Sequence, residues 1–357
     1  MARASVLVGM SGGVDSSVSA CLLAERGYEV LGSHLELVRS DGGLDHGCCG
    51  PTARADAAAV AAIGGFPFEV VDLRATFAET VLADFVEEHA AGRTPNPCAR
   101  CNEAIKFGAF LRRADDLGIG FVATGHYVRS VRDAGGAWHL LRGLDAGKDQ
   151  SYMLAGLGQD ELARSLFPVG GMTKAETRAH AERLGLPVAG KPDSQEVCFV
   201  ADGDHRAFLD GLAPDLARDG DVVDVAGTVL ARHGGLAGFT VGQRRGLGVS
   251  TGAPTYVLEL DAARNRVVVG PGELLARTGL VADRARWVAG GPPADGPFEA
   301  EVQLRYRGEP VASVVEVTHG EVVVSFRAPQ RGVAPGQSVV VRRGDEVLGS
   351  ARILRSA

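Results

Sequence analysis

The chain has 357 residues, of which 45% are hydrophobic and 23% are charged, and its formal net charge is −7. This length exceeds what one hydrophobic core usually holds, so we expect two or three domains in a soluble, cytoplasmic monomer. No apolar run approaches the roughly 20 residues of a membrane span, and no segment near the start has the pattern of a signal peptide. The net negative charge excludes a surface that is basic throughout and binds nucleic acid nonspecifically.

The cysteines and lysines are few enough to be informative. Six cysteines cannot form a disulfide scaffold in a chain this long, so they predict catalysis, redox chemistry or a metal. Lysines are rarer still among the 37 basic residues, which suggests sites that need a compact ammonium rather than a planar guanidinium. The four lysines are Lys106, Lys148, Lys174 and Lys191.

The N-terminal stretch predicts a phosphate site. A short apolar strand at 6–8 leads into a Gly-rich loop and then into a helical apolar pattern, so backbone N–H groups and a helix dipole converge on one point. The loop is neither a Walker motif nor GxGxxG, and SGGVDSS resembles the loop of the ATP pyrophosphatases, which cut ATP between its α and β phosphates. In that interpretation Asp15 helps to place Mg²⁺ beside the pyrophosphate; the alternative is an ordinary Gly-rich turn. The expected ATP-binding loop comprises Gly9, Met10, Ser11, Gly12, Gly13, Val14, Asp15 and Ser16.

The next elements alternate between strand and helix. Further strands are expected at 28–38, at the end of 61–73 and at 121–128, with helices at 55–62 and 103–117. This alternation predicts an α/β fold with a doubly wound, mostly parallel sheet, whose ligand lies at the carboxyl ends of the strands. Gly9, Leu35 and Gly125 would therefore gather around one nucleotide. The remaining cysteines of this region are interpreted as two spare thiols in a loop, Cys48 and Cys49, and one core residue, Cys21.

The segment 92–108 carries two more cysteines. Pro95 and Pro97 predict an extended approach, with Asn102 as the N-cap of the following helix. Cys101 would then stand at a helix N-terminus, where positive partial charge favours a reactive thiolate. A zinc site built on the CxxC pattern is the alternative, although it would need a second pair of ligands.

The following segments predict a hairpin with its turn at 133–136, a helix opened by residues 148–150, and a helix from Thr173 to Gly185. Residues 191–200 are expected to end in an apolar strand that carries Cys198. Beyond about residue 202 the strands become short and closely spaced, which predicts a small strand-rich module and a C-terminal β-barrel. We therefore expect a catalytic domain at 1–202, a small central domain at 203–276 and a β-barrel at 277–357. Arginines outnumber acidic residues only in the last of these, so the positive surface is expected there.

Several motifs in one order resemble the tRNA-specific 2-thiouridylases, which replace the C2 oxygen of the wobble uridine in certain tRNAs with sulfur. The motifs are SGGVDSS, TPNPCARCNEAIKF, TGHYVR, LLRGLDAGKDQSY, FPVG, KPDSQEVCFV and FTVGQRRGLG, continued by RYRG at 305–308 and APGQS at 334–338. They cover nearly the whole chain. The resemblance implies an adenine-nucleotide α-hydrolase-like sheet, ATP and Mg²⁺ as cofactors, and both tRNA and a persulfide sulfur-donor protein as partners.

The resemblance also implies roles for individual residues. Cys101 matches the catalytic nucleophile and Cys198 the cysteine that carries the persulfide sulfur, while Leu35 and Gly125 match positions that line the adenosine. The matching tRNA contacts are Asn96, Pro97, Cys98, His126, Lys148, Asp149, Gln150, Arg305, Tyr306 and Gln337. Many members of the family have Asp in place of Cys98, and this departure provides three thiols for an alternative [4Fe-4S] cluster on Cys98, Cys101 and Cys198.

The chemistry explains why these residue types are needed. Attack of the uridine C2 oxygen on the α-phosphorus of ATP converts a poor leaving group into an adenylate, and persulfide sulfur then replaces AMP. Either the persulfide attacks C2 directly, or Cys101 releases its outer sulfur by forming a disulfide with Cys198. A different adenylating ligase of the same superfamily, acting on a small molecule and resembling argininosuccinate synthetases, remains as a further alternative.

Overall fold

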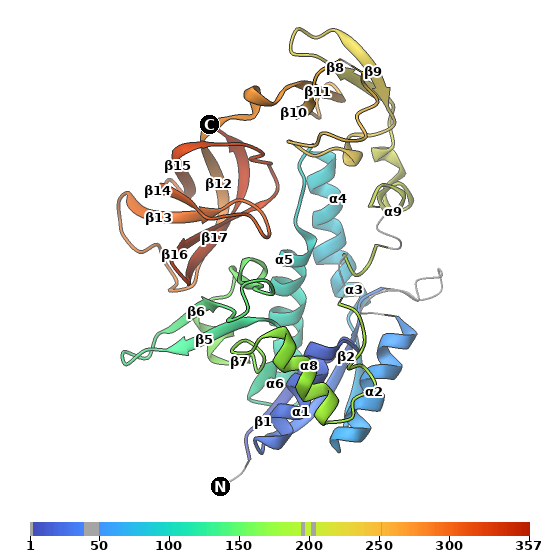
Figure 1. Ribbon diagram of the computed structural model, residues 1–357, viewed down its shortest axis with the longest axis vertical. Helices are drawn as coiled ribbons and strands as arrows, with labels where there is room; N and C mark the ends of the chain where they lie inside the picture. The colour runs from blue at the N-terminus through green and yellow to red at the C-terminus, as the bar shows by residue number, and fades with distance from the viewer. Residues whose placement is uncertain (1–2, 39–49, 194–196, 201–204, 251) are drawn as a thin grey trace.

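The computed structural model describes residues 3–38, 50–193, 197–200, 205–250 and 252–357 (Figure 1). Three parts are visible: an α/β domain that contains the N-terminus, a small strand-rich module and a C-terminal barrel. A continuous helical run over 74–90, which ends in the cyan α4 (Ala83–Ala90), extends from the α/β domain toward the other two parts. Within the described residues, no helix combines the length and hydropathy needed to cross a membrane.

The α/β domain is built on a fully parallel sheet with strand order β3-β2-β1-β4-β7. Side chains of successive residues in a strand point to opposite faces, so Val6 and Val8 of β1 face one apolar cluster whereas Leu7 faces another. Helices from both sides cover these faces, which confirms the doubly wound fold. The strands are β1 (Ser5–Gly9), β2 (Glu29–Glu36), β3 (Phe68–Asp72), β4 (Phe121–Ala123) and β7 (Ser165–Leu166).

Helices α1 (Val14–Glu25), α2 (Pro51–Gly64) and α8 (Lys174–Arg183) pack on the face of Val6, and α6 (Phe110–Asp116) packs on the face of Leu7. Helix α8 begins as expected, because the Thr173 hydroxyl accepts the Glu176 N–H and the Glu176 carboxylate accepts the Thr173 N–H. The remaining helices of this domain are short: α3 (Arg74–Phe77), η1 (Ala78–Leu82), α5 (Pro97–Cys101), η2 (Asn102–Ala109), η3 (Ser151–Leu154) and α7 (Gln159–Ala163).

Two local predictions in this domain are wrong. The helix expected to start after Asn102 begins at Pro97, because proline fits the first helical position and the Asn96 side chain accepts the Ala99 N–H at 3.1 Å. Cys101 therefore lies inside a continuous helical run over 97–116, part of it wound as the π-helix η2, and not at a helix N-terminus. The strand expected around Cys198 is also absent, since residues 198–200 form a turn.

The predicted strand at 121–128 is divided. Residues 121–123 form β4, whereas β5 (Val128–Arg132) turns away and forms the expected hairpin with β6 (Trp138–Arg142). This hairpin joins the C-terminal barrel, where Leu140 of β6 lies opposite Val347 of β17. A segment of the α/β domain thus extends the sheet of the barrel, so the two parts share backbone hydrogen bonds.

The central module holds α9 (His205–Leu212), η5 (Pro214–Leu216), η6 (Leu236–Gly238) and a sheet of order β10-β11-β8-β9. Its strands are β8 (Gly220–Val223), β9 (Val229–His233), β10 (Thr255–Asp261) and β11 (Arg266–Pro271), and η7 (Gly272–Leu275) leads into the barrel. The barrel is antiparallel and closes because β12 pairs with both β15 and β17. Its strands are β12 (Arg277–Trp287), β13 (Phe298–Gln303), β14 (Val311–Thr318), β15 (Glu321–Gln330), β16 (Ser338–Arg343) and β17 (Glu346–Ser356).

A buried ion network fastens the barrel to α4. The Arg352 guanidinium donates to both carboxylate oxygens of Asp84 at 2.8 and 3.1 Å, and lies 3.0 Å from the carboxylate of Glu88, which is 1% exposed. Arg93 also binds Glu88 in a bidentate pair at 2.6 and 2.7 Å. Burial raises the pKa of Glu88, but the two arginines outweigh it and hold that pKa below its ordinary value.

Candidate active site

The Gly-rich loop lies where β1 ends and α1 begins, and two of its close contacts require glycine. Gly12 has a left-handed backbone with φ of 67°, and a Cβ there would lie 2.2 Å from the Ala53 carbonyl oxygen of α2. A Cβ on Gly125 would lie 2.5 Å from the Ser16 nitrogen. Gly125, expected beside the adenosine, therefore packs directly against the start of α1, and the loop is wedged between α2 and the end of β4.

The rest of the loop is held by short polar contacts. Met10 is buried and its N–H donates to the Ser33 carbonyl at 2.8 Å, while the Ser16 hydroxyl accepts the Ser11 N–H at 3.2 Å. Gly13 precedes α1 and provides no side-chain acceptor for the first helical N–H groups. Such an uncapped N-terminus fits an anionic ligand. Leu35, near the end of the adjacent strand β2, is partly buried among apolar residues.

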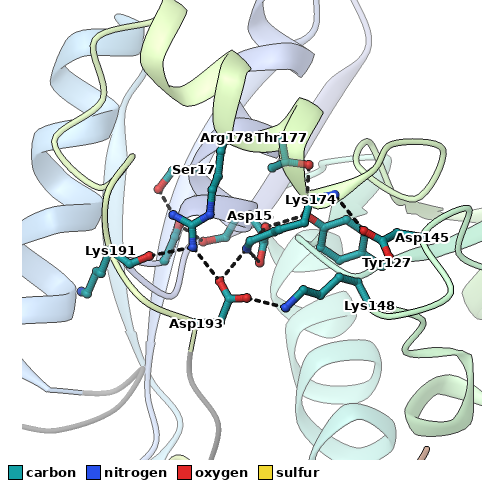
Figure 2. A network of polar contacts seen from close by, with 12 residues as sticks. Asp15, Ser17, Tyr127, Asp145, Lys148, Lys174, Thr177, Arg178, Lys191 and Asp193 are labelled. Atoms are coloured by element: carbon teal, nitrogen blue, oxygen red, sulfur yellow. Dashed lines mark hydrogen bonds and ion pairs between the residues drawn. The ribbon is translucent and has the colours of Figure 1, made fainter.

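Next to the loop, two lysines and an arginine contact the carboxylates of Asp15 and Asp193 (Figure 2). The Lys174 ammonium contacts both oxygens of Asp15, at 2.7 and 2.9 Å, and also Asp193 at 2.7 Å. Lys148 contacts Asp193 at 2.6 Å, and Arg178 contacts it at 3.2 Å. Burial raises the pKa of Asp193, but hydrogen bonds from Lys148 and Lys174 outweigh burial and lower it to about 2, so the carboxylate stays ionised.

Lys191 completes this cluster of cations on the side of α2. Its ammonium donates to the Gly12 carbonyl at 3.1 Å and to the Asp56 carboxylate at 2.7 Å. Two of the four lysines in the chain, Lys174 and Lys191, thus contact the Gly-rich loop directly, and Lys148 is joined to Lys174 through Asp193. The rarity of lysine was the only signal for Lys174 and Lys191, whereas Lys148 was expected to contact tRNA, and the contacts of Arg178 and Asp193 were not predicted.

Tyr127 connects the loop to the segment 148–151, and this connection was also missed. Its hydroxyl lies 2.8 Å from Asp15 Oδ1 and 3.0 Å from the Thr177 hydroxyl. Burial and the neighbouring Asp15 raise the pKa of Tyr127, so the phenol stays protonated. Its backbone N–H donates to the Gln150 side-chain oxygen at 3.0 Å and its carbonyl accepts the Gln150 N–H at 3.1 Å.

The expected magnesium ligand is engaged in these contacts. Asp15 Oδ1 accepts hydrogen bonds from the Tyr127 hydroxyl and the Lys174 ammonium, and Asp15 Oδ2 accepts one from the same ammonium. In this arrangement Asp15 serves as an ion-pair partner of Lys174.

The two candidate sulfur-transfer residues lie in the same apolar cluster. Cys101 is buried among Phe77, Val81, Ile105 and Phe199, and Cys198 packs against this cluster from its turn. Leu37, just beyond the end of β2, belongs to it as well. The cluster therefore borders the carboxyl edge of the sheet, which is the edge from which the phosphate loop emerges.

Cys98 is the third thiol that the iron–sulfur alternative requires. It is partly exposed and lies in the first turn of α5, outside the apolar cluster around Cys101. Across the residues that the structure describes, no three His, Cys, Asp or Glu side chains are grouped closely enough to hold a metal ion. The iron–sulfur and zinc alternatives thus have no preformed site there. Cys48 and Cys49 lie outside the described residues.

Of the candidate tRNA contacts, some already have structural roles. The Asp149 carboxylate accepts the N–H groups of Gly143 and Ser151 and pairs with Arg142 at 3.1 Å. Gln337 of the barrel donates to the Thr94 carbonyl at 2.8 Å, which ties β16 to the entrance of α5. Asn96 caps α5, Pro97 is buried at its first position, and Lys148 joins the Asp193 network.

His126 is buried, and its Nδ1 lies 2.7 Å from the Thr124 hydroxyl. Burial, reinforced by the nearby charge of Lys106, holds the pKa of His126 well below its ordinary value, so the ring is neutral near pH 7. Arg305 lines a cavity of about 390 Å³ between the central module and the barrel, together with Arg331 and Gln337. Tyr306 packs at the junction of the parts, 6.2 Å from the ring of Tyr152.

Comparison with known proteins agrees with this arrangement. A family model described as the tRNA methyl transferase HUP domain matches residues 4–202, a tRNA methyl transferase PRC-barrel domain matches 206–271, and an aminomethyltransferase beta-barrel domain matches 277–353. A relative named tRNA-specific 2-thiouridylase MnmA from Heliobacterium modesticaldum is 47% identical, over 99% of this chain and 93% of the relative. The relative of that name from Geobacter metallireducens is 48% identical, over 99% of this chain and 97% of the relative. The relative of that name in Kineococcus radiotolerans is 51% identical over 98% of both chains. Because of this similarity over nearly its full length, the chain belongs to the tRNA-specific 2-thiouridylase family.

Proposed function

We propose that this chain is a tRNA-uridine sulfurtransferase, which replaces the C2 oxygen of the wobble uridine with sulfur at the expense of ATP. The observation that carries the proposal is that Cys101 and Cys198, distant in the sequence, contact one apolar cluster at the edge of the sheet where the phosphate loop begins. A ligase that activates only small molecules would need the phosphate loop but would not need two thiols beside it.

In the first step the backbone of residues 9–16 binds the phosphates of ATP, which enters with Mg²⁺ as part of the substrate. The uridine C2 oxygen attacks the α-phosphorus, the bond from that phosphorus to the bridging oxygen breaks, and pyrophosphate departs with its electron pair. The loop N–H groups and nearby ammonium groups stabilise the charge that develops on the leaving group. To reach this site the base must leave the anticodon stack, as in other enzymes that act on single bases.

In the second step sulfur arrives as a persulfide on Cys198, supplied by a donor protein. Cys101 thiolate attacks the inner sulfur, a Cys101–Cys198 disulfide forms, and the released outer sulfur displaces AMP from C2. The two electrons that the enzyme loses in the disulfide are returned by a thiol reductant before the next cycle. In a variant of this route the persulfide attacks C2 directly and displaces AMP. Cys101 thiolate then attacks the Cys198 sulfur of the resulting Cys198–S–S–C2 linkage, which releases 2-thiouridine and leaves the same Cys101–Cys198 disulfide.

The three parts of the chain divide these tasks in our proposal. Residues 1–202 bind the nucleotide and carry the thiols, whereas 203–276 and 277–357 hold the tRNA. Arg305 and Arg331, which line the cavity between the central module and the barrel, have the chemistry to bind backbone phosphates.

Nucleoside mass spectrometry tests this function. The purified enzyme is incubated with tRNA, ATP and a persulfide donor, in air and under anaerobic conditions, and the tRNA is then digested. We expect 2-thiouridine in both atmospheres and none when ATP is omitted. Thiolation under anaerobic conditions alone, together with bound iron, would instead favour the cluster mechanism, and release of pyrophosphate without tRNA would favour a small-molecule ligase.

A further inference from the structure

Resting on the proposed function, we propose that Lys148, Lys174 and Arg178 form the pocket that receives the β- and γ-phosphates of ATP and the departing pyrophosphate. Asp193 competes with these phosphates for the same three donors. The carboxylate is an internal competitor that lowers the apparent affinity of the site for nucleotide.

The geometry of Asp193 is that of a bound anion. Its Oδ2 lies 2.6 Å from the Lys148 ammonium, and its Oδ1 lies 2.7 Å from Lys174 and 3.2 Å from Arg178 (Figure 2). Lys174 also contacts Asp15 in the phosphate loop. The pocket therefore adjoins the loop that would hold the remaining phosphate of the same nucleotide.

Two of the three donors, Lys174 and Arg178, also have contacts that do not involve Asp193. Arg178 donates to the carbonyls of Ala189 and Lys191 at 2.8 and 3.1 Å. Lys174 is the first residue of α8, and its backbone N–H donates to the Asp145 carboxylate at 2.9 Å. A pocket organised in this way persists when Asp193 is displaced or removed.

The charges favour a polyanion over a single carboxylate. Two ammonium groups and one guanidinium carry three positive charges, against which Asp15 and Asp193 supply two negative ones. Removing the charge of Asp193 leaves an excess of two positive charges beside the loop. A pyrophosphate group offers more oxygens and more negative charge than a carboxylate, so it satisfies the same donors more fully.

Calorimetric titration with inorganic pyrophosphate, ATP and AMP tests the competition. In the Asp193→Asn enzyme we expect Kd for pyrophosphate and ATP to fall by about tenfold, because an intramolecular competitor no longer occupies the donors. The Kd for AMP, which lacks the β and γ phosphates, should not change. Lys174→Met should raise Kd for pyrophosphate by on the order of tenfold or more, since it removes a charge-assisted contact.

Glu25→Gln is the matched control, because it removes one carboxylate from an exposed pair with Arg183 at the far end of α1. Its nucleotide affinities should equal those of the wild type. Thermal melting and an Asp193→Ser variant verify that any change in affinity does not come from misfolding. An Asp193→Asn enzyme that binds pyrophosphate as weakly as the wild type, or more weakly, overturns the proposal. The titration contains neither tRNA nor sulfur donor, so this failure is distinct from a failure of tRNA thiolation.

Discussion

Gly125 provides a sharp test of how tightly the phosphate loop is positioned. In Gly125→Ala the new Cβ would lie 2.5 Å from the Ser16 nitrogen and 2.6 Å from the Asp15 carbonyl carbon, whereas ordinary contacts begin near 3.4 Å. Both neighbours are backbone atoms and cannot rotate away, so the start of α1 must retreat by about 1 Å. Overpacking of this kind costs about 1–3 kcal/mol of stability, but a displacement of that size at reacting groups reduces turnover by about 100-fold.

The assay compares ATP binding and tRNA-dependent release of AMP in Gly125→Ala and in Gly120→Ala. Gly120 precedes the same strand, β4, and a Cβ there meets nothing within 4 Å. We expect both proteins to fold and the Gly120→Ala enzyme to retain its activity, while Gly125→Ala loses nucleotide affinity and turnover. If Gly125→Ala binds ATP and releases AMP as well as Gly120→Ala does, the loop is not positioned by this contact and the reasoning is refuted.

Three further outcomes are expected. Cys101→Ala and Cys198→Ala should each lose thiolation in the nucleoside assay while still binding ATP. Cys21 is buried elsewhere, so Cys21→Ala is the control and should remain active. Thiolation by the Cys101→Ala or the Cys198→Ala enzyme would contradict the sulfur relay. Arg352→Met removes one guanidinium from Asp84 and Glu88, which keep Arg284 and Arg93 as partners, and should cost about 1–3 kcal/mol in urea unfolding. The exposed Arg183→Met is the control and should change stability little, and equal effects of the two substitutions would contradict this account of the network. Because burial keeps His126 neutral in the folded chain, the unfolded chain takes up a proton below about pH 6.5 that the folded chain does not. Its contribution to stability is complete above that pH and is lost as the pH falls, at up to ~1.4 kcal/mol per unit. His126→Gln should flatten the decline in unfolding free energy between pH 7.5 and 5.5, and an unchanged slope would show that the ring does not titrate as argued.

The short-range patterns were sufficient for most of the fold. The strand-loop-helix of residues 6–18, the capped helix that begins after Thr173 and the hairpin turn at 133–136 form where they were expected. Each depends on residues within one or two turns of each other, so hydrophobic period and cap chemistry suffice to predict it. The start of the helix at Pro97 was missed because proline was interpreted as a breaker, although it is well tolerated at the first helical position.

The amino-acid sequence by itself determined that the chain has a Gly-rich loop between a strand and a helix, a doubly wound sheet and a C-terminal barrel, because each is a local pattern of residue types. It also supplied the two candidate thiols for sulfur transfer. Only the tertiary structure decided what these parts contact. It placed the β5–β6 hairpin in the sheet of the barrel, brought Cys198 to the cluster around Cys101, and surrounded Asp193 with Lys148, Lys174 and Arg178. Such contacts join residues that are far apart in the chain, and their free energy arises from burial and charge pairing that exist only after the chain has folded.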